Sequence, residues 1–119
     1  GYIFSWTPGN RLWRKNRRDN GGIPHTYGVD LNRNYNGPEW CTVGTGPPSS
    51  ETYCGTAPFS EPESNATRNF IIDELNNIQA VFDMHTAGPL VLWPWGYTDE
   101  VADDVAFFEE YGAELQEAV

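Results

Sequence analysis

The chain has 119 residues, enough for one small domain, and its 39% hydrophobic and 20% charged residues are ordinary for a globular protein. No apolar run approaches the ~20 residues that a membrane span needs, so we expect no membrane partner. The net charge of −10 and the sequence pI of 4.4 argue against binding of nucleic acid.

The first third of the chain is basic and rich in loop-forming residues. Residues 1–33 carry six basic and two acidic groups, whereas residues 34–119 carry one basic and fifteen acidic groups. The basic stretch has two interpretations: a few arginines that hold a small anionic ligand, or a solvated loop that balances the acidic remainder. Residues 1–7 are aromatic and β-prone, residues 8–26 read as a loop, and Tyr27–Asn32 reads as a short strand.

A long excursion rich in glycine and proline follows, over residues 37–59, and it contains both cysteines. Cys41 and Cys54 lie 13 positions apart on a segment that must turn, so they can form a disulfide. That pairing would indicate an oxidising compartment. Two free thiols remain the alternative, and a zinc pair is disfavoured because no further cysteine or histidine stands at a ligand spacing.

The second half of the chain alternates between helical and strand-like patterns. Ser60-Glu61-Pro62-Glu63 has the form of a capping box, which predicts a helix from there to about Leu75. Two apolar runs, Ile78–Met84 and Pro89–Trp95, predict strands, and the first is apolar enough to be buried on both faces. Residues 101–119 predict an acidic amphipathic helix with Val101, Val105, Phe108, Gly112 and Leu115 facing inward. This order predicts an α/β layered fold.

Two short segments carry chemistry. Asn32 and Arg33 place an amide beside a guanidinium, a pair that can hold a carboxylate. His85 ends the apolar run that begins at Ile78, and a lone imidazole there could be a metal ligand or a satisfied core histidine. Together they suggest a site that grips a carboxylate beside a metal, although the chain holds too few ligands to complete one.

Six segments in order make the chain resemble a zinc carboxypeptidase of the carboxypeptidase A/B type, and its bacterial secreted members in particular. They cover most of residues 10–98: Asn10-Arg11-Leu12-Trp13-Arg14-Lys15-Asn16-Arg17, Gly28-Val29-Asp30-Leu31-Asn32-Arg33-Asn34-Tyr35, Ser50-Glu51-Thr52-Tyr53, Pro58-Phe59-Ser60-Glu61-Pro62-Glu63, His85-Thr86 and Leu92-Trp93-Pro94-Trp95-Gly96-Tyr97-Thr98. The resemblance implies that residues 1–119 are the central part of one catalytic domain, and part of an α/β/α layered fold with a mixed sheet and a long stapled loop. It implies a secreted, monomeric exopeptidase that uses Zn²⁺ to cleave the C-terminal bond of peptides or proteins.

The resemblance also assigns roles to single residues. Arg14 matches the arginine that stabilises the oxyanion formed during hydrolysis, where a fixed positive donor is needed. Asn32 and Arg33 match the pair that binds the terminal carboxylate of the substrate. Arg11 matches a further arginine along the substrate cleft.

The remaining matches concern the metal and its surroundings. His85 matches the third zinc ligand of the family, and Thr86 beside it falls in the substrate-binding region. Asp30 matches a carboxylate that orients the first zinc-ligating histidine. These roles come from the resemblance alone.

The chain departs from the family pattern in three places. It has no His-x-x-Glu motif, since its only other histidine, His25, is followed three residues later by Gly28. The family's catalytic glutamate would lie beyond Val119. Ala87 and Gly88 follow Thr86, where many members carry an aromatic residue. We therefore expect the isolated 119 residues neither to bind zinc tightly nor to hydrolyse peptides.

Two other functions stay open at this point. The parent protein could be an inactive, peptidase-like binding protein. It would then lack the upstream His-x-x-Glu motif or the downstream catalytic glutamate. A secreted carbohydrate-binding module is suggested only by the acidity and by the content of tryptophan and tyrosine.

Overall fold

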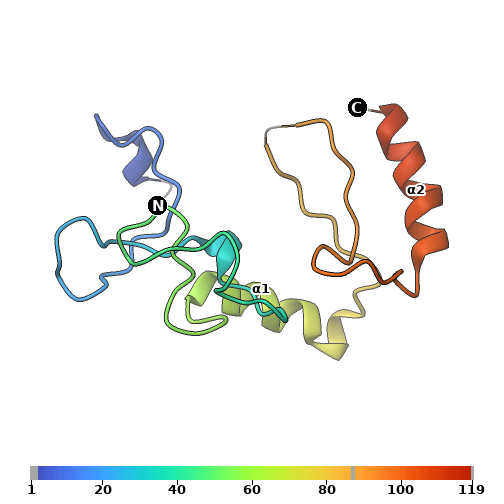
Figure 1. Cartoon of the computed structure of the whole chain (residues 1–119), viewed down its shortest axis with the longest axis horizontal. Helices are drawn as coiled ribbons and strands as arrows, with labels where there is room; N and C mark the ends of the chain where they lie inside the picture. Colours follow the sequence, from blue (N-terminus) through green and yellow to red (C-terminus); the bar gives the residue numbers. More distant parts are fainter. Residues whose placement is uncertain (1–2, 87, 119) are drawn as a thin grey trace. The chain divides into compact units, whose positions relative to one another are not determined.

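The structure is a computed structural model, and it describes residues 3–86 and 88–118 (Figure 1). Expectations that fall on residues 1, 2, 87 and 119 lie outside this range. The chain divides into two compact units, Gly1–Gln79 and Ala80–Val119, called here the N-terminal and C-terminal units. Its elements are η1 (Phe4–Trp6), η2 (Leu31–Arg33), α1 (Pro62–Ile72), η3 (Glu74–Asn76) and α2 (Val105–Ala118), where η denotes a 3-10 helix.

The expected mixed sheet is wrong, because the residues that the structure describes contain no β-strand. Of the strand expected at Tyr27–Asn32, residues 27–30 have no regular secondary structure, and Leu31 and Asn32 belong to η2. The Asp30 side chain accepts a hydrogen bond from the Asn32 amide, and its carbonyl accepts one from the Arg33 amide. Residues 78–84 and 89–95 have no regular secondary structure. A strand needs a neighbouring strand for its backbone groups, and neither segment has one among the described residues.

The N-terminal unit has a mainly polar interior. Val29 and Cys54 are its fully buried apolar residues, whereas the buried polar residues are more numerous: Lys15, Asn16, Thr26, Asp30, Asn34, Glu61 and Ser64. The expected disulfide is confirmed, because Cys41 and Cys54 are joined with their Cα atoms 5.7 Å apart. The long loop over residues 37–59 is therefore stapled, as the cysteine spacing suggested.

Helix α1 begins later than a capping box at Ser60 would place it. The N-cap residue is Glu61, whose side chain makes no capping hydrogen bond, and Pro62 occupies the first turn. The Ser60 hydroxyl instead donates to the Glu61 carboxylate at 2.8 Å. The helix ends at Ile72 rather than Leu75, and the chain continues through η3 to Asn77, which has a left-handed conformation (φ 46°).

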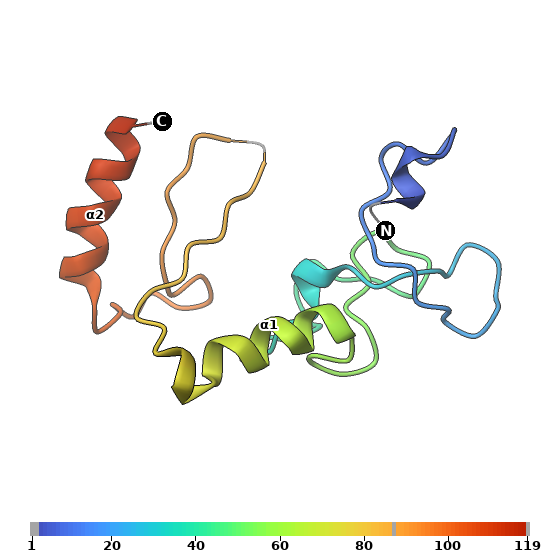
Figure 2. The ribbon, with the colours of Figure 1, turned by 180° about the vertical axis from the view of Figure 1, so that it is seen from behind.

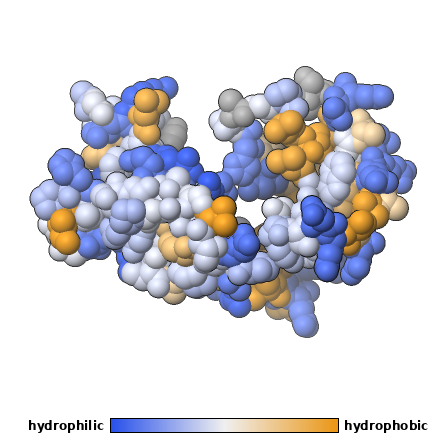
Figure 3. All heavy atoms as spheres, in the orientation of Figure 1, coloured by the Kyte–Doolittle hydropathy of each residue, from blue (hydrophilic) through white to orange (hydrophobic). Residues whose placement is uncertain are grey.

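In the described part of the C-terminal unit, residues 80–86 and 88–104 are irregular and are followed by α2, as both ribbon views show (Figures 1 and 2). Within its described part only Ala102 and Gly112 are buried. Val81 is 59% exposed and Leu92 is 81% exposed, so both expected strands leave apolar side chains in solvent. Figure 3 shows such hydrophobic residues at the molecular surface. No helix in the described part of the chain is long and apolar enough to cross a membrane.

Candidate functional site

Arg14 and Asp30 form an ion pair, although the family resemblance implies separate roles for them. The Arg14 Nη2 donates to Asp30 Oδ2 at 2.6 Å, across sixteen positions of sequence. The Asp30 side chain is almost fully buried, whereas nearly half of the Arg14 side chain is exposed. The pair thus fixes one edge of the guanidinium and leaves its other donors toward solvent.

Asp30 also organises the residues that follow it. Its Oδ1 accepts a hydrogen bond from the Asn32 amide at 3.2 Å and so caps η2. One carboxylate therefore holds both Arg14 and the turn that carries Asn32 and Arg33. The structure brings these four predicted site residues together within the N-terminal unit.

The stapled loop orients Arg33. The Arg33 Nε donates to the Gly44 carbonyl at 3.3 Å, and its Nη1 donates to the Asn32 carbonyl at 3.1 Å. Gly44 lies between the two cysteines of the disulfide. Two backbone carbonyls thus fix the plane of the guanidinium, and Nη2 makes no hydrogen bond within the described residues.

The residue after Arg14 ties the same loop to the basic segment. Lys15 is buried, and its Nζ donates to the carbonyls of Pro48 and Ser50, both at 2.9 Å. Burial lowers the pKa of Lys15, and the negative charges of Glu51 and Asp30 oppose this shift only in part. Lys15 is therefore an anchor of the loop rather than a free cation for a ligand.

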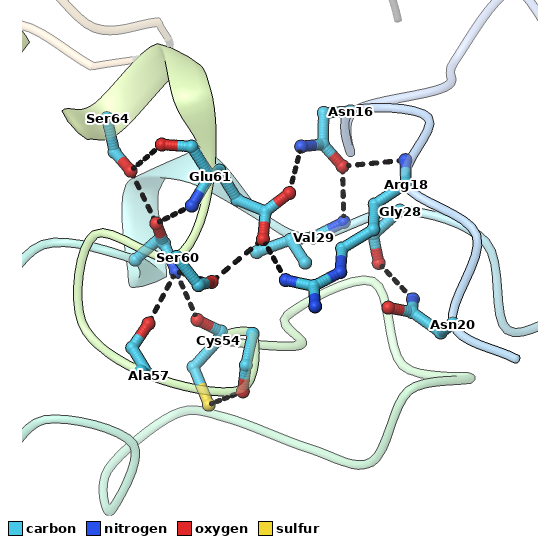
Figure 4. Close-up of polar contacts among 12 residues, drawn as sticks. Asn16, Arg18, Asn20, Gly28, Val29, Cys54, Ala57, Ser60, Glu61 and Ser64 are labelled. Carbon is cyan, nitrogen blue, oxygen red and sulfur yellow. Dashed lines mark hydrogen bonds and ion pairs between the residues drawn. The ribbon is translucent and has the colours of Figure 1, made fainter. Parts of the chain in front are cut away.

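A buried carboxylate at the start of α1 fixes the other side of the basic segment. Glu61 accepts hydrogen bonds from Asn16 Nδ2 and Arg18 Nη1, each at 2.6 Å, and from the Ser60 hydroxyl (Figure 4). Burial would raise the pKa of Glu61, but these hydrogen bonds and the Arg18 charge outweigh burial and hold the pKa below the usual glutamate value. Glu61 is therefore ionised at neutral pH.

Asn16 connects Glu61 to Val29, the residue before Asp30. Its Oδ1 accepts hydrogen bonds from the amides of Val29 at 2.7 Å and Arg18 at 3.2 Å. The backbone amide of Asn16 in turn donates to the Val29 carbonyl at 2.9 Å. Gly28 is required beside it, since a Cβ there would lie 2.3 Å from the Asn16 carbonyl oxygen.

The two remaining basic residues of the segment, Arg17 and Arg11, lie at the surface. Arg17 stacks its guanidinium on the rings of Phe4, Trp13 and Tyr27, at 3.8, 4.7 and 5.0 Å from their centroids. Arg11 is exposed and lines an open hollow together with residues 5–9. Most of the basic stretch is therefore explained by individual partners within the chain.

His85 and Thr86 belong to the C-terminal unit, and both are exposed. The His85 Nε2 lies 2.9 Å from Asp83 Oδ2. The described residues contain no group of three or more histidine, cysteine or acidic side chains that could hold a metal. A catalytic zinc needs three protein ligands, so these residues alone do not fit a zinc site.

Asn16, Asn34 and Glu61 are buried residues of this region that the sequence patterns missed as a group. The capping-box pattern includes Glu61, and Asn34 stands out only as part of a segment that matches the family. A buried asparagine has no periodic signal, because its partners are backbone groups far away in sequence.

Comparison with known proteins decides the family. The family described as zinc carboxypeptidase matches this chain over residues 1–119. The chain belongs to the zinc carboxypeptidase family. This confirms the resemblance that the six sequence segments indicated, and it establishes Zn²⁺ as the metal of the family.

Carboxypeptidase O from Homo sapiens is 45% identical over 103 residues, which cover 82% of this chain and 26% of that protein. Carboxypeptidase B2 from Homo sapiens is 41% identical over 120 residues, covering 100% of this chain and 27% of that protein. The solved structure of carboxypeptidase A from Helicoverpa armigera matches with a TM-score of 0.80 at 33% identity, over 96% of this chain and 27% of that one. The chain thus spans about a quarter of the length of the curated relatives it matches. The particular likeness to bacterial members stays a prediction.

Proposed function

We propose that the full-length protein containing this chain is a zinc-dependent carboxypeptidase that removes C-terminal residues from peptides or proteins. The observation that supports this most strongly is that the buried carboxylate of Asp30 pairs with Arg14 and caps the turn that carries Asn32 and Arg33, in a chain of the zinc carboxypeptidase family. In this proposal residues 1–119 form the central part of the catalytic domain. His85 is assigned as one zinc ligand, and Asp30 is assigned to orient a histidine ligand that lies outside this chain, as the family resemblance implies.

Arg33 and Asn32 are assigned to the terminal carboxylate of the substrate. Two carbonyls already orient the Arg33 guanidinium, and its Nη2 has no hydrogen bond within the described residues. The Asn32 side chain is exposed beside it and adds an amide donor. Charge-assisted hydrogen bonds to a carboxylate are about twice as strong as neutral ones, so this pair would favour a free chain end.

Arg14 is assigned to the oxyanion that develops on the scissile carbonyl. Its Nη2 is held by Asp30, so the remaining donors are preorganised rather than mobile. Arg11 and Thr86 are assigned to substrate binding, as the family resemblance implies. We further propose that the protein is secreted and monomeric; the Cys41–Cys54 disulfide supports an oxidising location.

The test is to express the full-length protein and to measure release of the C-terminal residue from a blocked dipeptide. The matched substrate is the same dipeptide with a C-terminal amide, and each assay is run with and without a zinc chelator. We expect release from the free acid only, and its loss on chelation. Binding of the free acid without turnover would refute the enzymatic function and would indicate a peptidase-like binding protein.

The carboxylate assignment has its own control within the chain. Arg33→Ala should raise KM for the free acid, whereas Arg68→Ala should leave KM unchanged. Arg68 is an exposed arginine of α1 whose Nη1 contacts its neighbour Asn69. Equal KM values for both variants would show that Arg33 does not bind the carboxylate.

A further inference from the structure

Asn34 is a fully buried polar side chain that directly follows the proposed carboxylate-binding pair. It is the C-cap residue of η2, and its amide donates to the Leu31 carbonyl at 3.1 Å. Its carbonyl accepts a hydrogen bond from the Phe59 amide at 2.7 Å. The backbone of Asn34 therefore joins the end of the turn to the end of the stapled loop.

The Asn34 side chain makes contacts on both of its polar atoms. Its Nδ2 donates to the carbonyls of Cys54 and Ala57 at 2.8 and 3.1 Å, and it lies 3.0 Å from the Ser60 hydroxyl. Its Oδ1 accepts hydrogen bonds from the Glu61 amide at 3.2 Å and from the Ser64 hydroxyl. One side chain thus contacts the disulfide, the loop after it and the first turn of α1.

The space around this amide is closed. Gly55 has φ +91°, and a Cβ there would lie 2.6 Å from Ser60 Oγ and 2.7 Å from Asn34 Nδ2. The loop can approach Asn34 closely only because residue 55 is glycine. A side chain held on all sides in this way has one available position, and so has the backbone that carries it.

We propose that Asn34 is a positioning residue that holds Asn32 and Arg33 in the orientation needed to bind the substrate's terminal carboxylate. This inference rests on the proposed function. Asn34 does not touch the carboxylate itself. It acts through Arg33, because a change in the backbone at residue 34 moves the preceding guanidinium, and a displacement of about 1 Å in a site can cost ~100-fold in rate.

Asn34→Asp separates this role from packing, since the two side chains have nearly the same size. The carboxylate keeps an acceptor for the Glu61 amide and the Ser64 hydroxyl. It cannot donate, so it would face the Cys54 and Ala57 carbonyls without a hydrogen bond to either. We expect the turn to shift away from those carbonyls.

The experiment measures kcat and KM of the full-length protein for a blocked dipeptide with a free C-terminus. For Asn34→Asp we expect KM to rise about tenfold or more while kcat stays within about threefold of the wild type. A residue with only a structural role would instead lower the active fraction, which reduces apparent kcat and leaves KM unchanged. Unchanged KM in the folded variant would overturn the inference.

Asn20→Asp is the matched control. The Asn20 Nδ2 also donates to two backbone carbonyls, those of Thr26 and Gly28, but it has no contact with η2. We expect this variant to keep the wild-type KM. The same rise in KM for both asparagines would overturn the specific role of Asn34.

Ser64→Ala keeps the test decisive if Asn34→Asp does not fold. This change removes one hydrogen bond to Asn34 Oδ1 and leaves the others in place. We expect KM to rise about threefold with little change in kcat, and an unchanged KM would count against the inference. If the wild-type protein releases no C-terminal residue, the proposed function fails and the inference fails with it; an active wild type with unchanged KM in the variants refutes the inference alone.

Discussion

The two units of the chain differ in what surrounds their residues. The N-terminal unit buries charged and amide side chains, each with hydrogen-bonding partners, around Glu61 and Asn34. The described part of the C-terminal unit buries only Ala102 and Gly112 and leaves residues such as Phe82 and Leu92 in solvent. Both units leave large apolar side chains in solvent, such as Leu12 in the first and Leu92 in the second, but only the N-terminal unit has a buried polar network among its described residues.

This difference shows which kind of residue pattern is enough to select one arrangement of segments in a chain of this length. Buried polar groups must be satisfied, so a network such as that of Asn34 selects one arrangement of its segments. Apolar segments select an arrangement only when they find something apolar to cover them. The following predictions test this contrast, from the largest expected effect to the smallest.

Loss of Arg14 should have the largest effect. In the full-length protein, Arg14→Ala should lower kcat by ~10²–10³-fold, as removal of other oxyanion donors does. It should also reduce stability, because Asp30 would remain buried without its ion-pair partner. Steady-state kinetics and thermal unfolding measure the two effects separately. The control Arg14→Lys keeps the charge without the planar fork and should lose less stability; wild-type kcat in Arg14→Ala would refute the oxyanion role.

Removal of the disulfide should be next in size. For a closed loop of this length the chain-entropy relation gives about 3 kcal/mol of stabilisation, so Cys41→Ser with Cys54→Ser should lower the unfolding free energy by that order. Urea unfolding of the oxidised and reduced wild-type chain provides the matched measurement without any substitution. A loss well below about 1 kcal/mol would mean that Lys15 and Asn34 already hold the loop without the staple.

The same substitution in each unit compares them directly. Val29 is fully buried, so Val29→Ala should lower the unfolding free energy of the 119-residue chain by about 2 kcal/mol. Val81 is 59% exposed, so Val81→Ala should change it by less than about 0.5 kcal/mol. Urea unfolding of both variants measures the difference. Equal losses would show that the C-terminal unit buries Val81 in solution, and the contrast between the units would then be wrong.

Acid should weaken the N-terminal unit through Glu61. Its pKa lies below the usual 4.5 in the folded chain, so the ionised form contributes stability that is fully present above the unfolded pKa. That contribution is lost as the pH falls through the lowered folded pKa. We expect the unfolding free energy to decline below about pH 4.5, and Glu61→Gln to flatten this decline. Glu109→Gln, at an exposed position of α2, should leave the pH profile unchanged.

Sequence patterns predicted what depends on neighbours along the chain. The cysteine spacing indicated the staple, and the proline in the first turn and the apolar periodicity indicated helices near α1 and α2. The strand at Tyr27–Asn32 was wrong, because side chains take backbone amides there: Asn16 accepts from the Val29 amide and Asp30 from the Asn32 amide. The two later strands were wrong because strand formation depends on partners that no local pattern contains.

The residues of the candidate site could be predicted from the sequence, but the contacts between them could not. Motif likeness selected Arg14, Asp30, Asn32 and Arg33, yet no spacing rule joins Arg14 to Asp30 across sixteen positions. The same holds for Asn34. Its partners Cys54 and Ala57 lie in the loop over residues 37–59, and its partner Ser64 lies in helix α1. Long-range polar contacts of this kind follow from the fold and not from the local sequence.

Zinc binding by the isolated chain should give the smallest signal. His85 is the one histidine of the C-terminal unit, and the described residues offer it no group of further ligands. Because a structural or catalytic zinc takes three or four protein ligands, titration of the purified 119 residues should give a dissociation constant weaker than about 10 µM. His85→Ala and the control His25→Ala should both leave this weak binding nearly unchanged. Nanomolar affinity that His85→Ala alone abolishes would mean that the chain gathers ligands around His85 in solution, and the C-terminal unit would then be the better specified of the two.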